Sequence, residues 1–395
     1  MESHSARESR FAVFSSYLGM ASLAAALNTP PICLTAMADT FGLDEARMGT
    51  VAAAVFSGVV LGIGGAGPLG DRFGIKPFLL FGAMLQAAGM LVLGKSPNFS
   101  AALGGAFLAG CGGGVLDALL SPFVCALRPR EKSRAMNLLH AFYCIGAAVT
   151  VGLGMGVLRF GGQWRTLFLA GAVPSVLAFS GLALARPPAL PAARSDYVPL
   201  RKLLRIPRFY LFLAAMFFAG GAELGPAQWL PAYAERVLDW PRALAPAILF
   251  GFSAAMAAGR LSGARISRCF RPTEILIGAA LACSLLLFVM SPPGFAPAFV
   301  PAGALFGLAV ATLWPTTLAL TAIRFPGGGA AMFSALGAVG NAGGVLAPWC
   351  IGVVAQYAGF HWALASVVLF PLALAASAAV IRFRPAAAEG MAQSS

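Results

Sequence analysis

Charged side chains are scarce in this sequence. Asp, Glu, Lys and Arg make up 10% of its 395 residues, whereas 59% of the residues are hydrophobic. Soluble domains carry about 25% charged residues, so this composition excludes an ordinary soluble fold. The alternation of apolar and polar residues that marks a membrane β-barrel is also missing from the sequence. The composition therefore predicts a chain that crosses a lipid bilayer as helices.

Motifs for catalysis and cofactor binding are missing too. Seven cysteines are scattered without a C-x-x-C pair, which argues against a zinc site and a disulfide framework. No G-x-x-x-x-G-K-[ST] phosphate loop occurs, and a G-x-G-x-x-G match at residues 62–67 has no strand before it. No Ser-His-Asp set or metal-ligand cluster is found in the sequence. We expect no enzyme activity, no metal and no cofactor, and an ion gradient in place of ATP as the energy source.

Twelve apolar stretches are long enough to cross a membrane. About 20 residues cross roughly 30 Å of hydrocarbon as a helix, and a helix satisfies all of its backbone hydrogen bonds internally. The stretches are residues 11–37, 47–69, 77–94, 98–126, 135–158, 164–185, 209–234, 243–264, 272–291, 295–323, 329–356 and 360–381.

Basic residues between the stretches indicate the orientation of the chain. With a cytoplasmic N-terminus, 21 of the 27 Lys and Arg residues fall on the cytoplasmic side, Arg260 among them. Those left outside are Arg47, Lys95, Arg159, Arg165, Arg236 and Arg242. The positive-inside rule therefore predicts a multi-pass protein of the cell (inner) membrane with both termini in the cytoplasm. The net charge of +13 is a topology signal, and no basic-aromatic module indicates binding to nucleic acid.

The sequence is a doubled unit with an offset of 193 residues. The segment that starts at Gly70 has a weaker copy at Gly263, and Pro122 corresponds to Pro315. We expect an all-α integral membrane protein with twelve transmembrane helices in two pseudo-symmetric six-helix bundles, which we take to be a monomer. The predicted parts are a first bundle at residues 1–185, a linker at 186–208 with one short helix, and a second bundle with a short tail at 209–395. Repeats of this kind bind a solute at their interface near the midplane.

Two segments predict helix breaks at that interface. Asn28-Thr29-Pro30-Pro31 lies in the first stretch, and residues 220–226, with three glycines and one proline, lie in the seventh. The offset of 193 brings Glu223 onto position 30. Proline removes a backbone donor and frees a carbonyl, so both breaks are predicted to offer backbone groups to a solute.

Only Asp117 and Glu223 are acids deep inside the stretches. The helical rise places Asp117 about 16 Å from Arg128 at one membrane edge, and Glu223 about 18 Å from Glu235 at the other. Acids at this depth are costly and usually functional, and a carboxyl removed from water favours its protonated form. Both are predicted proton-coupling groups, with His140 as a third because imidazole titrates near neutral pH. The alternative is that each of the three only fixes helix packing or caps a break.

Polar and aromatic residues in the stretches are candidates for binding a solute, because hydroxylated ligands need amides and flat aromatic faces together. Trp and Tyr also mark membrane interfaces or pack between helices. The predicted substrate-binding residues are Asn28, Tyr143, Gln228, Trp229, Trp314 and Asn341.

Residues 67–76 resemble the G-x-L-a-D-r-x-G-r-k signature of the major facilitator superfamily, and the doubled layout is similar to that family over nearly the whole chain. In the family this loop helps to latch the two halves in one state. The resemblance assigns this role to Gly67, Gly70, Asp71, Arg72, Gly74 and Lys76. The second copy has Ala264 in place of the aspartate.

A finer resemblance is to the fucose-permease-like branch of that superfamily. It is carried by residues 110–117, 137–147, 221–223 and 337–348. The resemblance implies proton-coupled uptake of a small sugar-like solute, with Asp117 as a coupling group. The alternatives are an exporter of amphipathic compounds or drugs by proton antiport, and a membrane receptor that binds its ligand without moving it.

Overall fold

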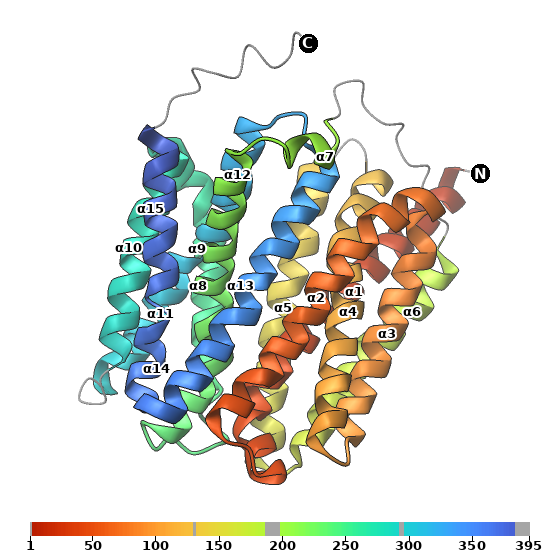
Figure 1. The fold of residues 1–395 in the computed structure, drawn as a ribbon. Helices are drawn as coiled ribbons and strands as arrows, with labels where there is room; N and C mark the ends of the chain where they lie inside the picture. Colours follow the sequence, from red (N-terminus) through yellow and green to blue (C-terminus); the bar gives the residue numbers. More distant parts are fainter. Residues whose placement is uncertain (1, 129–131, 186–197, 292–295, 384–395) are drawn as a thin grey trace.

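The computed structural model describes residues 2–128, 132–185, 198–291 and 296–383, and the regular secondary structure in these ranges is entirely α-helical. Figure 1 shows the helices as a bundle with both termini at one end, which we call the terminal end. The first half of the chain contains α1 (Glu2–Phe41), α2 (Glu45–Phe73), α3 (Ile75–Lys95), α4 (Phe99–Leu127), α5 (Lys132–Arg159) and α6 (Trp164–Leu184).

A short helix, α7 (Leu200–Leu203), lies within the predicted linker and precedes the second half. The second half contains α8 (Phe209–Arg236), α9 (Ala247–Cys269), α10 (Pro272–Met290), α11 (Ala296–Val310), α12 (Leu313–Arg324), α13 (Gly329–Ala358), α14 (Phe360–Ser366) and α15 (Leu369–Phe383). Within the described ranges, eleven helical segments are long and apolar enough to cross a membrane, and Ala247–Ser262 is a shorter apolar helix at the predicted eighth stretch. The prediction of an all-α membrane protein with about twelve spans is confirmed.

Two predicted spans are each divided into two helices, in both cases four residues before a proline. The span 295–323 is divided between α11 and α12, where Pro315 has no N–H to bond Ala311. The span 360–381 is divided between α14 and α15, where Pro371 has none for Val367. By contrast, the breaks predicted at residues 28–31 and 220–226 are wrong, because α1 and α8 continue as helices through Pro30, Pro31 and Pro226.

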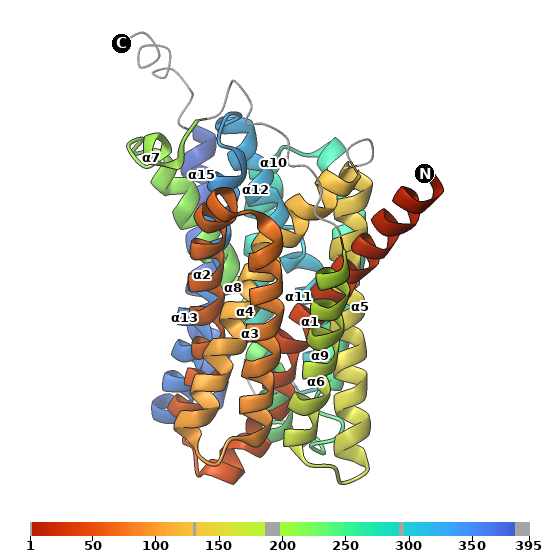
Figure 2. The same cartoon turned by 90° about the vertical axis from the view of Figure 1, so that its right-hand side faces the viewer.

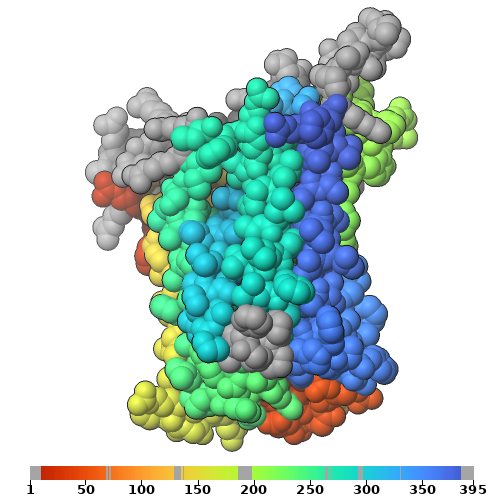
Figure 3. All heavy atoms as spheres, turned by 90° about the vertical axis from the view of Figure 1, so that its left-hand side faces the viewer, coloured from red at the N-terminus to blue at the C-terminus, as the bar shows by residue number. Residues whose placement is uncertain are grey.

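Apolar side chains cover the outside of the bundle. On α10, Leu281, Leu285 and Phe288 are 50%, 63% and 62% exposed and share one helix face. Helix α10 lies on the side of the molecule seen in Figure 3. A row of large exposed apolar side chains is what contact with lipid tails requires.

Glycines allow the closest helix contacts inside each half. A Cβ at Gly110 of α4 would collide with the Val55 carbonyl of α2, and one at Gly112 would collide with the backbone of Gln86 in α3. In the second half, Gly220 of α8 meets the backbone of Gly340 in α13 in the same way. Small residues of this kind let membrane helices approach without a gap.

Within the described ranges, the two halves meet mainly through α2 with α13, α1 with α8, and α5 with α9. The ribbon views show α2 beside α13 (Figures 1 and 2). At the end opposite the termini, Gly49 of α2 approaches the backbone of Pro348 and Trp349 in α13. Nearer the terminal end, a Cβ at Gly67 of α2 would lie 3.7 Å from the Ser334 hydroxyl of α13.

Charged side chains also join the halves at the end opposite the termini. We call Thr35, Asp39, Glu235, Arg236 and Arg242 the end clamp. Arg242 bonds Glu235 through Nε at 2.9 Å and Asp39 through Nη2 at 2.5 Å, and Arg236 lies 3.6 Å from Asp39. The Thr35 hydroxyl donates to Glu235 at 2.6 Å. Partial burial alone would lower the pKa of Arg242, but the two carboxylates outweigh it and raise that pKa, so the cation persists.

Candidate functional site

A cavity between the halves brings together side chains from five helices. It is lined by residues of α1, α2, α5, α8 and α9, and it encloses about 40 Å³. The lining residues are Leu27, Asn28, Phe56, Tyr143, Cys144, Ala147, Glu223, Leu224, Ala227, Gln228, Leu249, Phe252, Ser253 and Met256. Amide, phenol, hydroxyl and carboxyl groups therefore meet an apolar wall at the interface predicted for a solute.

A partly buried ion pair stands beside this cavity. Arg260 Nη2 of α9 lies 2.8 Å from Glu223 Oε1 of α8. The Glu223 side chain is 9% exposed and that of Arg260 is 30% exposed, so the arginine is the more accessible partner. Glu223 Oε2 and Arg260 Nε are both buried and have no hydrogen-bond partner among the described residues. The pair is thus joined by one hydrogen bond and keeps unused donor and acceptor atoms.

Helix periodicity explains how Arg260 reaches this place. Leu249, Phe252, Ser253 and Met256 line the cavity at helical spacing, and Arg260 follows one turn later on the same face of α9. The sequence interpretation treated Arg260 as a marker of the cytoplasmic side. Its position inside the apolar stretch 243–264 was the signal that it belonged elsewhere.

The carbonyl of Leu27 connects the two halves next to the ion pair. Pro31 has no N–H, so it cannot make the helical bond to Leu27 four residues before it. Instead, Gln228 Nε2 of α8 donates to the Leu27 oxygen at 3.2 Å. Helix α1 does not break at Pro31, but the proline still leaves the Leu27 carbonyl free, as predicted from the sequence. This carbonyl is bound by Gln228 and not by a solute.

Asn28 and Tyr143 line the cavity as predicted. They reach it from α1 and α5, and Asn28 Nδ2 donates to the Ala24 carbonyl at 2.8 Å. His140 is exposed on α5, one turn before Cys144, and interacts electrostatically with Arg260. These groups surround the ion pair from the first half of the chain.

Asp117 lies apart from this cavity. It is half-buried on α4 and has no hydrogen bond or ion pair with another described residue. Gly113, one turn earlier on the same helix, faces Leu23 of α1 and Gln86 of α3. The structure therefore does not gather Asp117 and Glu223 around one cavity, and no bond joins Asp117 to His140 in the described part of the chain.

Three other predicted binding residues pack inside the second half. Trp229 is 1% exposed and donates from Nε1 to the Pro348 carbonyl at 2.9 Å. The ring of Trp314 packs against Gly340. Asn341 is 6% exposed, and its amide donates to the Gly337 carbonyl at 2.9 Å. None of the three lines the cavity beside Glu223.

The predicted latch segment spans the end of α2 and the start of α3. Gly74 has a φ of +88° and forms the turn between the helices, while Gly70 accepts its backbone hydrogen bond. The Lys76 ammonium donates to the Ala183 and Ala185 carbonyls at the end of α6. The side chains of Asp71 and Arg72 lie outside the described part of the structure.

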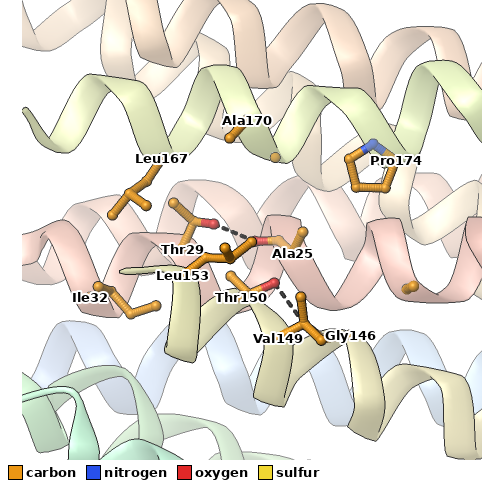
Figure 4. Close-up of a pocket in the computed structure, with 12 residues that line it drawn as sticks. Ala25, Thr29, Ile32, Gly146, Val149, Thr150, Leu153, Leu167, Ala170 and Pro174 are labelled. Atoms are coloured by element: carbon orange, nitrogen blue, oxygen red, sulfur yellow. Dashed lines mark hydrogen bonds between the residues drawn. The ribbon is translucent and has the colours of Figure 1, made fainter. Parts of the chain in front are cut away.

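A larger cavity of about 110 Å³ lies between α1, α5 and α6 within the first half. Figure 4 shows its lining, which is apolar except for two hydroxyls. Thr29 donates to the Ala25 carbonyl and Thr150 to that of Gly146, so both hydroxyls are bonded to their own helices. This cavity offers volume but no free polar group, and the smaller one beside Glu223 is the better candidate site.

Known proteins with similar sequences include a sugar symporter and a drug-resistance protein. A family model described as Major Facilitator Superfamily matches residues 11–326. The arabinose-proton symporter of Bacillus subtilis (strain 168) is 28% identical over 149 residues, which are 36% of this chain and 32% of the symporter. The multidrug resistance protein MdtH of Shigella dysenteriae serotype 1 is 32% identical over 136 residues, 32% of this chain and 33% of that protein. The matches thus span about a third of each curated relative.

The fold is similar to that of a solved transporter over nearly its full length. The fucose:proton symporter of E. coli aligns with 95% of this chain and 99% of its own, with a TM-score of 0.64 and 20% sequence identity. At this identity the likeness is one of fold, and the chemistry of the site has to be argued from the residues of this chain.

Proposed function

Because the chain belongs to the major facilitator superfamily, we propose that it is a secondary active transporter that moves a small polar solute across the membrane by alternating access, coupled to protons. One observation carries the proposal. The partly buried Glu223–Arg260 pair stands beside a cavity at the interface of the two halves, where doubled transporters bind their solutes.

The orientation of the molecule follows from its charges. The bias of Lys and Arg toward the terminal end supports placing the protein in the cell (inner) membrane with that end, and both termini, on the cytoplasmic side. The end clamp then faces outward and holds the halves together on that side. A cavity of about 40 Å³ is smaller than a sugar-sized solute, so the halves have to separate further before such a solute enters.

Proton coupling is assigned to acids that lie deep in the spans. Asp117 is half-buried and has no partner among the described residues, which leaves its carboxyl able to exchange a proton with water in one state. Glu223 is held by Arg260 and becomes available for a proton when that bond opens. His140 lies beside the same pair and offers a relay group.

Export of amphipathic compounds by proton antiport is the second candidate function. Apolar side chains, among them Phe56, Phe252 and Met256, form one wall of the cavity, and one similar protein is a multidrug resistance protein. The partly buried charged pair favours a polar solute, because an apolar drug gains nothing from it. A sugar-like solute agrees with this lining, because its hydroxyl groups can bond the amide, phenol and hydroxyl groups there.

Transport into liposomes tests this function. The purified chain would be reconstituted with a pH-sensitive dye inside, and polar solutes and drugs would be added outside. We expect a polar solute to cross together with protons. Asp117→Asn should lower the proton flux and solute accumulation while leaving solute exchange, because an amide keeps the shape of the carboxyl but cannot bind and release a proton. The matched control is Asp239→Asn, which removes an exposed acid in a loop.

Two results would contradict the proposal. If solutes bind but none crosses, the chain is not a transporter. If a solute crosses without protons, or Asp117→Asn leaves the proton flux unchanged, the assignment of Asp117 as a coupling group fails.

A further inference from the structure

Arg260 is the only basic side chain that is bonded beside the cavity in the described part of the chain. Its guanidinium offers five N–H donors, of which the bond to Glu223 uses one on Nη2. The Nε donor is buried without a partner among the described residues. An arginine held in this way keeps unused N–H donors for a second anionic acceptor.

The acceptor atoms near this arginine are too few to satisfy it. Glu223 Oε1 takes one bond, but Glu223 Oε2 points elsewhere and is itself buried without a described partner. A carboxylate that met the guanidinium edge-on would make two parallel bonds, the stronger geometry. The internal carboxylate therefore holds Arg260 in place without making its best bond.

Stability does not account for the pair. Taking two charges out of water costs several kcal/mol per ion, and a buried pair is often no more stable than an apolar replacement of the same volume. The Glu223–Arg260 pair is joined by one hydrogen bond and leaves Glu223 Oε2 and Arg260 Nε without partners among the described residues, so it contributes little to the stability of the fold. Its position beside the cavity between the halves is better explained by exchange of partners during a binding cycle.

Resting on the function proposed above, we propose that the solute is a small organic monoanion whose carboxylate displaces Glu223 from Arg260. The charge of the site decides the class. One arginine balances one negative charge, and the described lining residues supply no second cation for a phosphate of about two charges at neutral pH. Asn28, Tyr143 and Ser253 remain to bond the hydroxyl or carbonyl groups of the same molecule.

Charge balance also requires a proton. Before binding, Arg260 and Glu223 sum to zero. After the solute carboxylate takes Arg260, the released Glu223 carboxylate accepts a proton from water, so that the site again sums to zero. The only bonds that change are the O–H bond formed on Glu223 and the O–H bond broken in the water that donates the proton, so one solute anion and one proton enter the site together. The other titratable groups that face the pair are His140, Tyr143 and Cys144 of α5 and Cys283 of α10.

Thermal unfolding of the full chain in detergent tests this inference with matched probes. The probes are lactate and lactamide, nicotinate and nicotinamide, and gluconate and sorbitol. At least one carboxylate should raise the Tm, while its neutral counterpart should not, because a ligand of the folded state stabilises it. Arg260→Gln should weaken the binding of that carboxylate about 10- to 100-fold, which is the effect of losing a hydrogen bond to a charged group.

Glu223→Gln separates an exchange of anions from a structural role. It removes the internal competitor, so the carboxylate should bind more tightly than to wild type, and the pH dependence of its affinity between about 5.5 and 8 should become weaker, because only His140 still titrates near the pair in this range. In wild type the affinity should rise as the pH falls, because protonated Glu223 releases Arg260. If Arg260→Gln alone does not fold, the double variant Glu223→Gln/Arg260→Gln carries no buried charge and replaces it.

The inference is overturned if no carboxylate of the set shifts the Tm, if the neutral counterparts shift it equally, or if Glu223→Gln weakens carboxylate binding. Liposome flux separates this failure from failure of the proposed function. If the protein transports a neutral solute and Arg260→Gln does not change that transport, the inference of an anionic solute is wrong but the proposed transport function stands. If a carboxylate binds through Arg260 but never crosses the membrane, the inferred binding site stands but the proposed transport function is wrong.

Discussion

At the residue scale, Gln228 and Pro31 illustrate how two ambiguous signals combine. The sequence indicated that the prolines of the first span would free a carbonyl, and it identified Gln228 as a polar residue for a solute. The structure joins them, since Gln228 Nε2 donates to the Leu27 oxygen that Pro31 leaves free. Nothing in a single sequence pairs residues 201 positions apart, so this link between the halves could not be predicted.

Gln228→Leu should therefore destabilise the protein. The Leu27 carbonyl would lose its partner in a partly buried place, where an unsatisfied carbonyl costs up to about 1–3 kcal/mol, and the Tm measured by circular dichroism in detergent should fall. Gln356→Leu is the control. The Gln356 side chain accepts a bond from Ala46 N at 3.1 Å at an exposed position, where water replaces it, so its Tm should change much less. Equal losses for the two variants would show that the Leu27 bond contributes nothing particular.

Depth in a span was enough to identify Glu223 but not its partner. An acid near the midplane is conspicuous because it is costly there, whereas Arg260 lies near the end of a stretch that is followed by three further arginines. The bias of basic residues toward one side therefore concealed it. Asp117 was equally conspicuous, but its distance from Glu223 depends on how the halves pack, which depth along a helix does not determine.

At the element scale, proline did not act as the sequence suggested. The chain separates into two helices before Pro315 and Pro371, yet α1 and α8 run on through their prolines. Whether a helix continues past a proline depends on which group bonds the carbonyl that the proline leaves free and on the packing around it. In α1, Gln228 bonds the Leu27 carbonyl. Span positions were predictable because they need only length and hydrophobicity. Continuity needs tertiary contacts that a local pattern does not contain.

Glycine contacts give a prediction at the same scale. In Gly112→Ala the new methyl group would collide with backbone atoms of Gln86 and Gly82 in α3. Overpacking of this kind costs about 1–3 kcal/mol, so α3 and α4 should separate and the Tm should fall. Gly104→Ala is the matched control on α4, because nothing lies within 4 Å of its added Cβ.

The control variant should be neutral or slightly more stable, since Ala exceeds Gly in helix propensity by about 1 kcal/mol. Both variants are compared by thermal unfolding and by the fraction that elutes as a single species from size exclusion. If the two alanines behaved alike, close approach of α3 and α4 would not limit the stability of the first half.

At the scale of the whole molecule, composition and doubling predicted the architecture, but not how the halves are held. Apolar stretches of span length and a repeat offset of 193 are properties of the chain itself. The end clamp is different, because Asp39, Glu235 and Arg242 belong to loops or helix ends that read as ordinary membrane-edge charges. The bonds from Arg242 to Asp39 and from Thr35 to Glu235 exist only when the two halves meet, so the end clamp belongs to one arrangement of the halves.

Cross-linking across this end tests whether the arrangement is one state of a cycle. Ala46 of α2 and Gln356 of α13 are joined by a hydrogen bond across the halves, so Ala46→Cys with Gln356→Cys, in a background free of the seven native cysteines, should form a disulfide under mild oxidation. Alternating access requires this end to open, so the disulfide should stop solute flux in liposomes and reduction should restore it.

Adding Arg242→Ala should lower the rate of cross-linking, because Asp39 and Glu235 then lose the cation between them and the closed arrangement loses population. The effect should be small, since exposed pairs contribute about 0.2–1 kcal/mol each, and it should shrink further in high salt, which screens the charges of the intact clamp. Arg47→Ala is the control, because Arg47 pairs with Asp44 on its own helix start and not across the halves. If cross-linked protein still transports, the halves do not separate at this end, and the clamp is a permanent joint rather than a gate.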